Sequence, residues 1–268
     1  MGTVQFAATL QACAKELESL NIFKSVSLPQ TRPLSKGEVL GCTSPKLDQI
    51  DETSIDLVIF IADGRFHIES AMIMNPKLPI FRYNPYDKTF TRELYNHIDM
   101  KITRKKVIET AISLRKSDPT KPWVVLLSTL GRQGNPKILN NLIKAAKNLS
   151  PPLPIIPVLM AEIQPEKLKN FKNTEVFVQI GCPRLSIDWG PDTVEKPLLT
   201  PYEGMIAMEN MSKRPEWLDD PENLDKVYPM DFYSNDSSGN WTNNHVDNRP
   251  DRSAIAKKIR RSKQVVNL

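Results

Sequence analysis

An apolar strand runs into a tight turn that carries a cysteine at Val178-Gln179-Ile180-Gly181-Cys182-Pro183-Arg184. The same pattern occurs earlier in the chain, at Val39-Leu40-Gly41-Cys42-Thr43-Ser44-Pro45. Glycine lets the backbone turn tightly and keeps side chains away from the sulfur. Because open α/β sheets place their chemistry at the carboxyl ends of strands, two such turns can bring both thiols to one crevice.

The strands and helices expected around these turns predict an α/β fold. The run Asp56-Leu57-Val58-Ile59-Phe60-Ile61-Ala62 is apolar and β-branched, which is typical of a buried parallel strand. Further strands are expected near 24–28 and at 78–83, 123–127, 155–159 and 175–180. Helices are expected at 4–20, at 91–117 with Thr91 as N-cap, at 136–149 and from Thr200 to about residue 211. The alternation predicts two similar parallel-sheet α/β domains, 1–118 and 119–212, followed by an irregular C-terminal tail, 213–268.

The tail is rich in Asp, Asn, Ser and Pro, and we expect it to be extended and partly disordered. Its aromatic residues Tyr228, Phe232 and Trp241 are expected to pack against the body. From Arg249 onward it has seven Lys or Arg and one Asp, a balance of +6 in a chain whose net charge is +5. The rest of the chain therefore carries about −1 (5 minus 6), which excludes a general nucleic-acid binder.

The composition is that of an ordinary globular protein. The chain has 268 residues, of which 40% are hydrophobic and 25% charged. No apolar run reaches the roughly 18 residues of a membrane span. The N-terminus lacks the features of a secretory signal, and three widely spaced cysteines form no disulfide framework. We therefore expect a cytoplasmic protein that binds neither membrane nor DNA.

Cysteine is also a common small apolar core residue, so a purely structural role for Cys42 and Cys182 stays open. The third cysteine illustrates that role, because it falls in the apolar stripe of an amphipathic helix. The stripe consists of Phe6, Leu10, Cys13, Leu17 and Leu20. We expect Cys13 to lie in the core and to take no part in chemistry.

The loop Ser128-Thr129-Leu130-Gly131-Arg132-Gln133-Gly134-Asn135-Pro136-Lys137 joins a strand to a helix N-terminus. Its Gly131 and Gly134 let the backbone approach a ligand, and free N–H groups at a helix start attract an anion. Either a carboxylate or a phosphate suits such a site. A simple tight turn explains the same glycines, so both interpretations stay open.

A second strand-end loop, Ala62-Asp63-Gly64-Arg65-Phe66-His67-Ile68-Glu69-Ser70, groups four ionisable side chains. Loops of this kind often carry function, and Asp63 is a candidate binding residue. Alternatively, Asp63 and Arg65 form a structural ion pair. His67 can serve as an acid or base, or it can simply form a hydrogen bond.

At these loops the sequence resembles the first-subunit family of the eukaryotic diphthamide-synthesis enzyme, 2-(3-amino-3-carboxypropyl)histidine synthase. The resemblance covers about residues 3–245. The stretches that carry it include Gly41-Cys42-Thr43-Ser44-Pro45, Asp63-Gly64-Arg65-Phe66-His67-Ile68-Glu69-Ser70, Thr129-Leu130-Gly131-Arg132-Gln133-Gly134-Asn135-Pro136-Lys137, Cys182-Pro183-Arg184-Leu185-Ser186-Ile187-Asp188-Trp189-Gly190 and Tyr228-Pro229-Met230-Asp231-Phe232-Tyr233.

The resemblance implies an enzyme that carries a [4Fe–4S] cluster and acts on S-adenosylmethionine. Family members have three similar α/β domains, each giving one cysteine thiolate to a single cluster. The reduced cluster cleaves the Cγ–S bond, and a 3-amino-3-carboxypropyl radical adds to C2 of a histidine imidazole in translation elongation factor 2. The implied partners are that elongation factor, a paralogous second subunit and a small iron-binding protein that delivers electrons.

Carried onto this chain, Cys42 and Cys182 match the family's second and third ligand motifs. By position and chemistry, Arg184 and Gln133 are candidates for binding the carboxylate and amino groups of S-adenosylmethionine, since Arg offers a bidentate fork.

The first domain and its cysteine are expected before residue 1, so we expect this chain alone to be poorly active. No catalytic acid or base is assigned. Two other hypotheses stay open: a non-catalytic scaffold subunit of the same complex, and a structural zinc or thiol protein.

Overall fold

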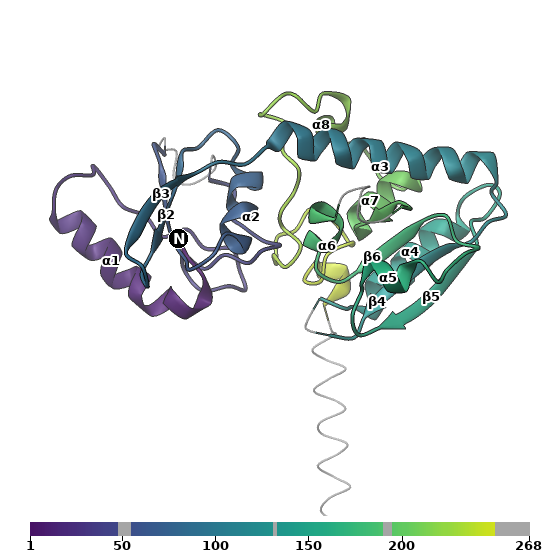
Figure 1. Cartoon of the computed structure of the whole chain (residues 1–268), viewed down its shortest axis with the longest axis horizontal. Coiled ribbons are helices and arrows are strands. Elements are labelled where there is room, and N and C mark those ends of the chain that lie inside the picture. Colours follow the sequence, from purple (N-terminus) through teal and green to yellow (C-terminus); the bar gives the residue numbers. More distant parts are fainter. Residues whose placement is uncertain (48–54, 131–132, 190–194, 250–268) are drawn as a thin grey trace, which may run out of the picture.

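The computed structural model describes residues 1–47, 55–130, 133–189 and 195–249, and it contains two α/β units that lie side by side (Figure 1). The α/β class predicted from the sequence is confirmed. The strands are β1 (Val58–Ile61), β2 (Ile80–Asn84), β3 (Thr89–Glu93), β4 (Trp123–Ser128), β5 (Ile155–Met160), β6 (Phe177–Ile180) and β7 (Leu198–Leu199). The helices are η1 (Val4–Phe6), α1 (Ala7–Ser19), α2 (Phe66–Met74), α3 (His97–Ser117), α4 (Pro136–Lys147), α5 (Pro165–Leu168), α6 (Arg184–Asp188), α7 (Pro201–Ala207), α8 (Glu216–Asp219) and η3 (Val246–Asn248).

The second unit is built on a parallel sheet of strand order β5-β4-β6-β7. Its central strand β4 is buried on both faces, with Val124, Val125 and Leu126 at 0% exposure, as expected of a parallel strand covered by helices. Leu127 of β4 pairs with Ile180 of β6. The loop after β4 and the turn after β6 therefore emerge side by side at the carboxyl edge of this sheet.

The first unit has a mixed sheet of order β1-β2-β3 rather than the parallel sheet predicted from the sequence. Strands β1 and β2 are parallel, but β3 runs antiparallel to β2. Lys88 has a φ of 57° in the turn that reverses the chain between β2 and β3. Phe90 of β3 then stacks on Phe81 of β2, with 5.4 Å between the ring centroids. A tight turn and a cross-strand aromatic pair therefore favour a hairpin at this edge.

The long helix begins later than predicted, so the assignment of Thr91 as its N-cap is wrong. Thr91 lies in β3, and α3 begins at His97. Asn96 caps the helix by accepting a hydrogen bond from the Asp99 N–H at 3.2 Å. None of the helices in the described parts of the chain is long and apolar enough to cross a membrane.

Helix α3 packs against the second unit, although in sequence it follows the first. Val107 and Ile108 belong to the same core as the residues of β4. Arg104 is fully buried and pairs with Glu203 of α7 at 2.7 Å. Burial opposes the charge of Arg104, but attraction to Glu203 outweighs it and raises the pKa of Arg104. Helix α3 lies before residue 118 in the sequence, yet it contributes to the core of the second unit. The predicted domain boundary at residue 118 stays a prediction.

The N-terminal helix is confirmed as η1 followed by α1, but it is less buried than its apolar stripe predicts. Leu10 is its one buried residue. Cys13 is half-buried rather than in the core, and it lines a groove of about 750 Å³ between α1 and β1. The strand expected at 24–28 is absent, because Val26 and Leu28 pack along the same groove without joining a sheet.

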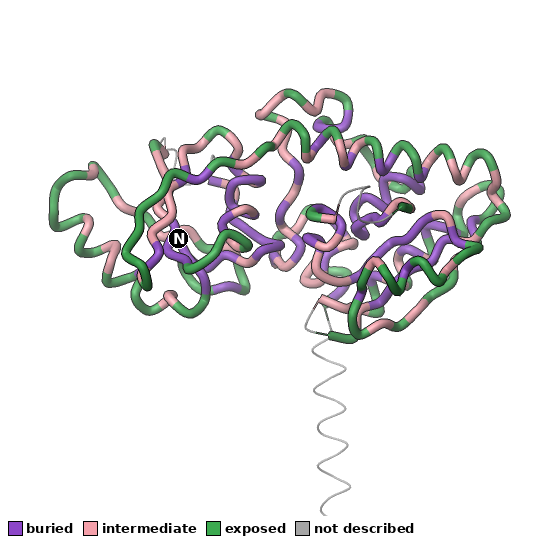
Figure 2. The backbone as a smooth tube through the Cα atoms, in the orientation of Figure 1, coloured by how far each residue is buried: buried purple, intermediate pink, exposed green. Residues whose placement is uncertain are grey.

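The chain from residue 213 to residue 249 packs against the body rather than extending from it (Figure 2). Tyr228 and Phe232 are buried and Trp241 packs on the same core, as predicted. We call residues 228–249 the C-terminal strap. It contacts both units: the Ser44 N–H donates to the Met230 carbonyl at 2.9 Å, and Asn141 of α4 donates to the Asn240 carbonyl at 3.0 Å. The basic end of the tail, from residue 250, lies outside the described residues.

Candidate functional site

Cys42 lies in a closed turn of the first unit. Leu40 and Thr43 exchange two backbone hydrogen bonds across this turn, at 3.0 and 3.2 Å. A Cβ at position 41 would lie 2.2 Å from a ring carbon of Phe66, so a larger residue there would have to displace that ring. The turn therefore fits closely against α2, and Cys42 is only 2% exposed.

Cys182 lies in the matching turn at the end of β6 and is half-buried. The side-chain amide of Gln179 donates to the Cys182 carbonyl at 2.8 Å, which fixes the turn. Burial raises the pKa of the Cys182 thiol, while hydrogen bonds from the backbone N–H groups of Arg184 and Leu185 oppose that shift. The turn thus presents donors that stabilise a thiolate at the start of α6.

The two cysteines lie close enough for their charges to interact. The pKa of Cys42 is raised to about 11, chiefly by burial; repulsion from Cys182 adds to the shift, while hydrogen bonds from the Thr43 and Gln133 side chains oppose it. The fold therefore brings Cys42, Cys182 and Gln133 together from distant parts of the sequence. A raised pKa keeps the Cys42 thiol protonated near neutral pH until a metal ion displaces the proton.

The loop after β4 carries Gln133 to the Cys42 sulfur, and Gly134 shapes that loop. A Cβ at position 134 would lie 1.8 Å from the carbonyl oxygen of Ser128. Asn135 then caps α4 by accepting a hydrogen bond from the Lys137 N–H at 2.9 Å. The close approach of the backbone at Gly134 to the Ser128 carbonyl thus explains why glycine occupies this position. A binding role for Gly134 stays a prediction. Gly131, the other predicted glycine, lies outside the described residues.

We expect Gly134→Ala to lower stability by about 1–3 kcal/mol, since the added carbon meets a backbone oxygen that cannot rotate away. The displaced loop also withdraws Gln133 from the Cys42 sulfur. Thermal unfolding measures the effect. Gly64→Ala is the matched control, because a Cβ at position 64 has no atom within 4 Å. Equal melting temperatures for the two variants would contradict this account of the loop.

Arg184 is engaged by groups of the protein itself. Its Nε donates to Asp188 at 2.8 Å, one terminal nitrogen donates to the Phe66 carbonyl at 2.7 Å, and the other pairs with Glu69. The guanidinium also lies 4.8 Å from the centroid of the Phe66 ring. Its side chain is 4% exposed. Arg184 therefore joins α6 to α2, and its role in binding the carboxylate of a substrate stays a prediction.

The loop after β1 is organised differently from the prediction. Arg65 pairs with Glu93 and donates to the Leu94 carbonyl at 2.9 Å, so an ion pair between Arg65 and Asp63 is wrong. Burial lowers the pKa of His67, although the negative charge of Asp63 opposes the shift. His67 is therefore neutral near pH 7. Asp63 is exposed at the end of β1, and a binding role for it stays a prediction.

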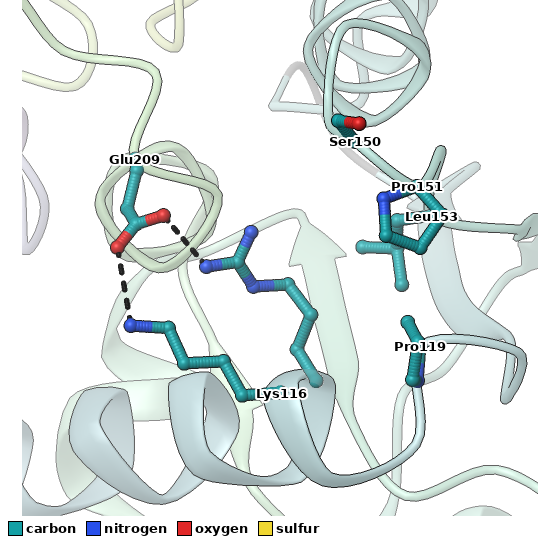
Figure 3. Close-up of a pocket in the computed structure, with 7 residues that line it drawn as sticks. Lys116, Pro119, Ser150, Pro151, Leu153 and Glu209 are labelled. Atoms are coloured by element: carbon teal, nitrogen blue, oxygen red, sulfur yellow. Dashed lines mark hydrogen bonds and ion pairs between the residues drawn. The ribbon is translucent and has the colours of Figure 1, made fainter.

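Two cavities are lined by other parts of the chain. One, of about 260 Å³, lies at the C-terminal end of α3, and Figure 3 shows residues that line it. Its cationic side chains, Arg115 and Lys116, both pair with Glu209, at 2.8 and 3.5 Å. The other cavity is the groove beside Cys13. Neither is lined by Cys42 or Cys182.

The donor set at the paired turns fits part of an iron–sulfur site. Thiolates are the usual ligands of such clusters, and hydrogen bonds to the ligating sulfurs tune them. The Cys42 sulfur already has a side-chain donor, Thr43, at 3.6 Å, and the Gln133 side chain also lowers the pKa of this thiol. Over the described ranges, no group of three or more His, Cys, Asp or Glu side chains could hold a metal ion. Cys42 and Cys182 thus bring two thiols to the paired turns, while the third cysteine, Cys13, lines the groove beside α1.

A family model for diphthamide synthesis proteins matches residues 1–218 of the chain. The chain belongs to this family. Curated relatives named 2-(3-amino-3-carboxypropyl)histidine synthase subunit 1 are each 45% identical to it in Mus musculus, Homo sapiens and Candida albicans, over 94%, 93% and 89% of this chain. The chain spans about half the length of these relatives, 51% in each case.

A solved structure has the same fold as this diphthamide synthesis protein. It is the crystal structure of Dph2 from Pyrococcus horikoshii with a 4Fe-4S cluster, which matches with a TM-score of 0.58 and 23% sequence identity. The match covers 80% of this chain and 57% of that chain. A second structure of Dph2 from the same organism matches with a TM-score of 0.59. These likenesses show a shared fold.

Sequence reasoning missed the groups that hold the two turns in place. The Phe66 ring packs against Gly41, and Glu69 of the same helix pairs with Arg184. Phe66 and Glu69 are three residues apart in the stretch 62–70, a spacing that places both side chains on one face of a helix. This spacing could have predicted that the two residues act together. The strap also contributes, because the Phe232 N–H donates to the Cys42 carbonyl at 3.3 Å. No local pattern in the sequence marks that contact.

Proposed function

We propose that this chain is part of a cytoplasmic enzyme that catalyses the first step of diphthamide biosynthesis. The reaction is the transfer of a 3-amino-3-carboxypropyl group from S-adenosylmethionine to C2 of a histidine imidazole in translation elongation factor 2. The name of the relatives, 2-(3-amino-3-carboxypropyl)histidine synthase subunit 1, describes that product. The partners in this proposal are a paralogous second subunit and a small iron-binding electron donor.

The proposal is supported above all by the convergence of Cys42, Cys182 and Gln133, whose interactions meet at the Cys42 sulfur. Cys42 and Cys182 would hold two irons of a [4Fe–4S] cluster as thiolates. When bound, the reduced cluster supplies the electron that cleaves the Cγ–S bond of S-adenosylmethionine. A 4Fe-4S cluster is present in the P. horikoshii protein that shares this fold.

The chain's own residues position these groups and limit the access of water. The Cys42 turn is closed by its own hydrogen bonds and lies against Phe66, which leaves the sulfur almost without exposure. Arg184 joins the helix that follows Cys182 to the helix that supports Cys42. The two sulfurs are thus held on rigid elements, as a preorganised site requires. Gln133 lies beside them as the candidate contact for the amino or carboxylate group of the substrate.

We expect an anaerobically reconstituted complex of this chain with its second subunit to contain iron and acid-labile sulfide and to modify elongation factor 2. We expect the isolated chain to take up little cluster, since it brings two thiols, Cys42 and Cys182, to the site where the family uses three. Iron and sulfide analysis, electron paramagnetic resonance and a transfer assay check both expectations. A stoichiometric four-iron signal from the isolated chain would contradict the second.

The same measurement separates two other functions. Zinc without iron or sulfide in anaerobically purified protein would support a structural zinc protein. Full activity of a complex in which this chain has lost both Cys42 and Cys182 would support a scaffold subunit. The paired thiols favour the enzyme, because a scaffold has no need of two cysteines that approach each other from different units.

A further inference from the structure

The Thr43 hydroxyl lies between the C-terminal strap and the Cys42 sulfur. Thr43 is 0% exposed. Its Oγ1 accepts a hydrogen bond from the Tyr233 backbone N–H at 2.7 Å and lies 3.6 Å from Cys42 Sγ, to which it donates. A backbone N–H can only donate, so the bond from Tyr233 uses an acceptor position of the hydroxyl. The single hydroxyl proton is thereby left to point at the sulfur.

The strap is held firmly enough to fix this orientation. The Ser44 N–H donates to the Met230 carbonyl at 2.9 Å and the Phe232 N–H donates to the Cys42 carbonyl at 3.3 Å, so backbone bonds flank Thr43 on both sides. Met230 and Phe232 are buried in a core that contains both Val125 of β4 and Cys42 of the first unit. The strap that orients the Thr43 hydroxyl is therefore anchored where the two units meet.

We propose that Thr43 is a positioning residue, whose hydroxyl is oriented by the Tyr233 N–H to donate a hydrogen bond to the sulfur of Cys42. The consequence for an iron site rests on the proposed function. A hydrogen bond to a ligating thiolate withdraws negative charge from it and raises the reduction potential of a cluster. The device depends on residues 228–233, which lie beyond the span of the family model, residues 1–218.

Two variants that differ in the hydroxyl test the proposal. Thr43→Val keeps the branched shape and removes the hydroxyl, whereas Thr43→Ser keeps the hydroxyl. The first readout is the Raman S–H stretching band of the apoprotein, recorded with Cys13 and Cys182 replaced by serine so that Cys42 is the one thiol left. We expect Thr43→Val to displace the band and Thr43→Ser to leave it in place. If Thr43→Val does not fold, Thr43→Ala provides the hydroxyl-free variant.

The second readout is the reduction potential of the reconstituted complex, with all three cysteines present. We expect Thr43→Val to lower this reduction potential and Thr43→Ser to leave it at the wild-type value. An identical S–H band in the protein with Thr43 and in both hydroxyl-free variants, all recorded with Cys42 as the one thiol, would overturn the proposal. Failure of the wild-type complex to bind a cluster would count against the proposed function instead, because the apoprotein band still decides where the hydroxyl points.

Discussion

Cys42→Ser and Cys182→Ser are each expected to abolish cluster incorporation and, with it, transfer to elongation factor 2. Serine matches the size of cysteine but is a poor ligand for iron in such clusters. Loss of a ligand should exceed the roughly 10–100-fold loss that follows from changing a residue behind a metal ligand. Iron and sulfide content and the transfer rate of the reconstituted complex measure the effect.

Cys13→Ser is the matched control for this pair. Cys13 lines the groove beside α1 and is expected to leave both the iron content and the transfer rate unchanged. Circular dichroism and thermal unfolding show whether the variants fold. Normal iron content in folded Cys42→Ser would exclude this sulfur as a ligand and remove the main support for the proposed site.

Arg104→Met is expected to cost about 3–5 kcal/mol of unfolding free energy, because it leaves a buried carboxylate without its partner. Arg104 and Glu203 are 1% and 0% exposed, and two nitrogens of the guanidinium reach the two carboxylate oxygens at 2.7 Å each. The same guanidinium donates to the carbonyls of Ser186 and Leu198. Urea unfolding at neutral pH measures the loss.

A double-mutant cycle tests the physical reason. The double variant Arg104→Met, Glu203→Leu removes both charges. Its loss of unfolding free energy should therefore be smaller than the sum of the losses in the two single variants. Lys213→Met is the exposed control, since Lys213 pairs with Glu216 at the surface, and it should leave the unfolding midpoint unchanged. Additive losses in the cycle would show that the two buried groups do not depend on each other.

The elements that the sequence predicted correctly are those that depend on a few neighbouring residues. The apolar run that ends at Leu127 became the central strand β4, and Thr200 became the cap of α7, with Glu203 completing a capping box. Both Gly-Cys turns formed, because glycine and the following breakers decide such turns locally. Only Cys182 follows a strand, β6; the described residues before Cys42 form isolated bridges rather than the predicted strand. The Cys42 turn is held near Cys182 without lying at the carboxyl end of a strand, so the rule for open α/β sheets accounts for the place of Cys182 alone.

The errors come from partners that are distant in sequence. The pairing of Arg184 with Glu69 was not foreseen, because Glu69 lies 115 residues away. The start of α3 was misplaced because a threonine is a good cap wherever it is exposed, and only pairing with β2 shows that Thr91 belongs to a strand. A role for the strap was equally hidden, since its contacts with Cys42 and Thr43 use backbone groups, which every residue carries.

The bond from Tyr233 to Thr43 spans 190 residues, and this separation has a consequence for assembly during translation. At about 5–20 residues per second, Thr43 leaves the peptidyl-transferase centre about 10–40 s before its partner is made. During that interval the nascent chain has the Cys42 turn but lacks the backbone groups that close over it. If the proposed cluster is bound here, we expect it to be loaded on released protein rather than on ribosome-bound chains.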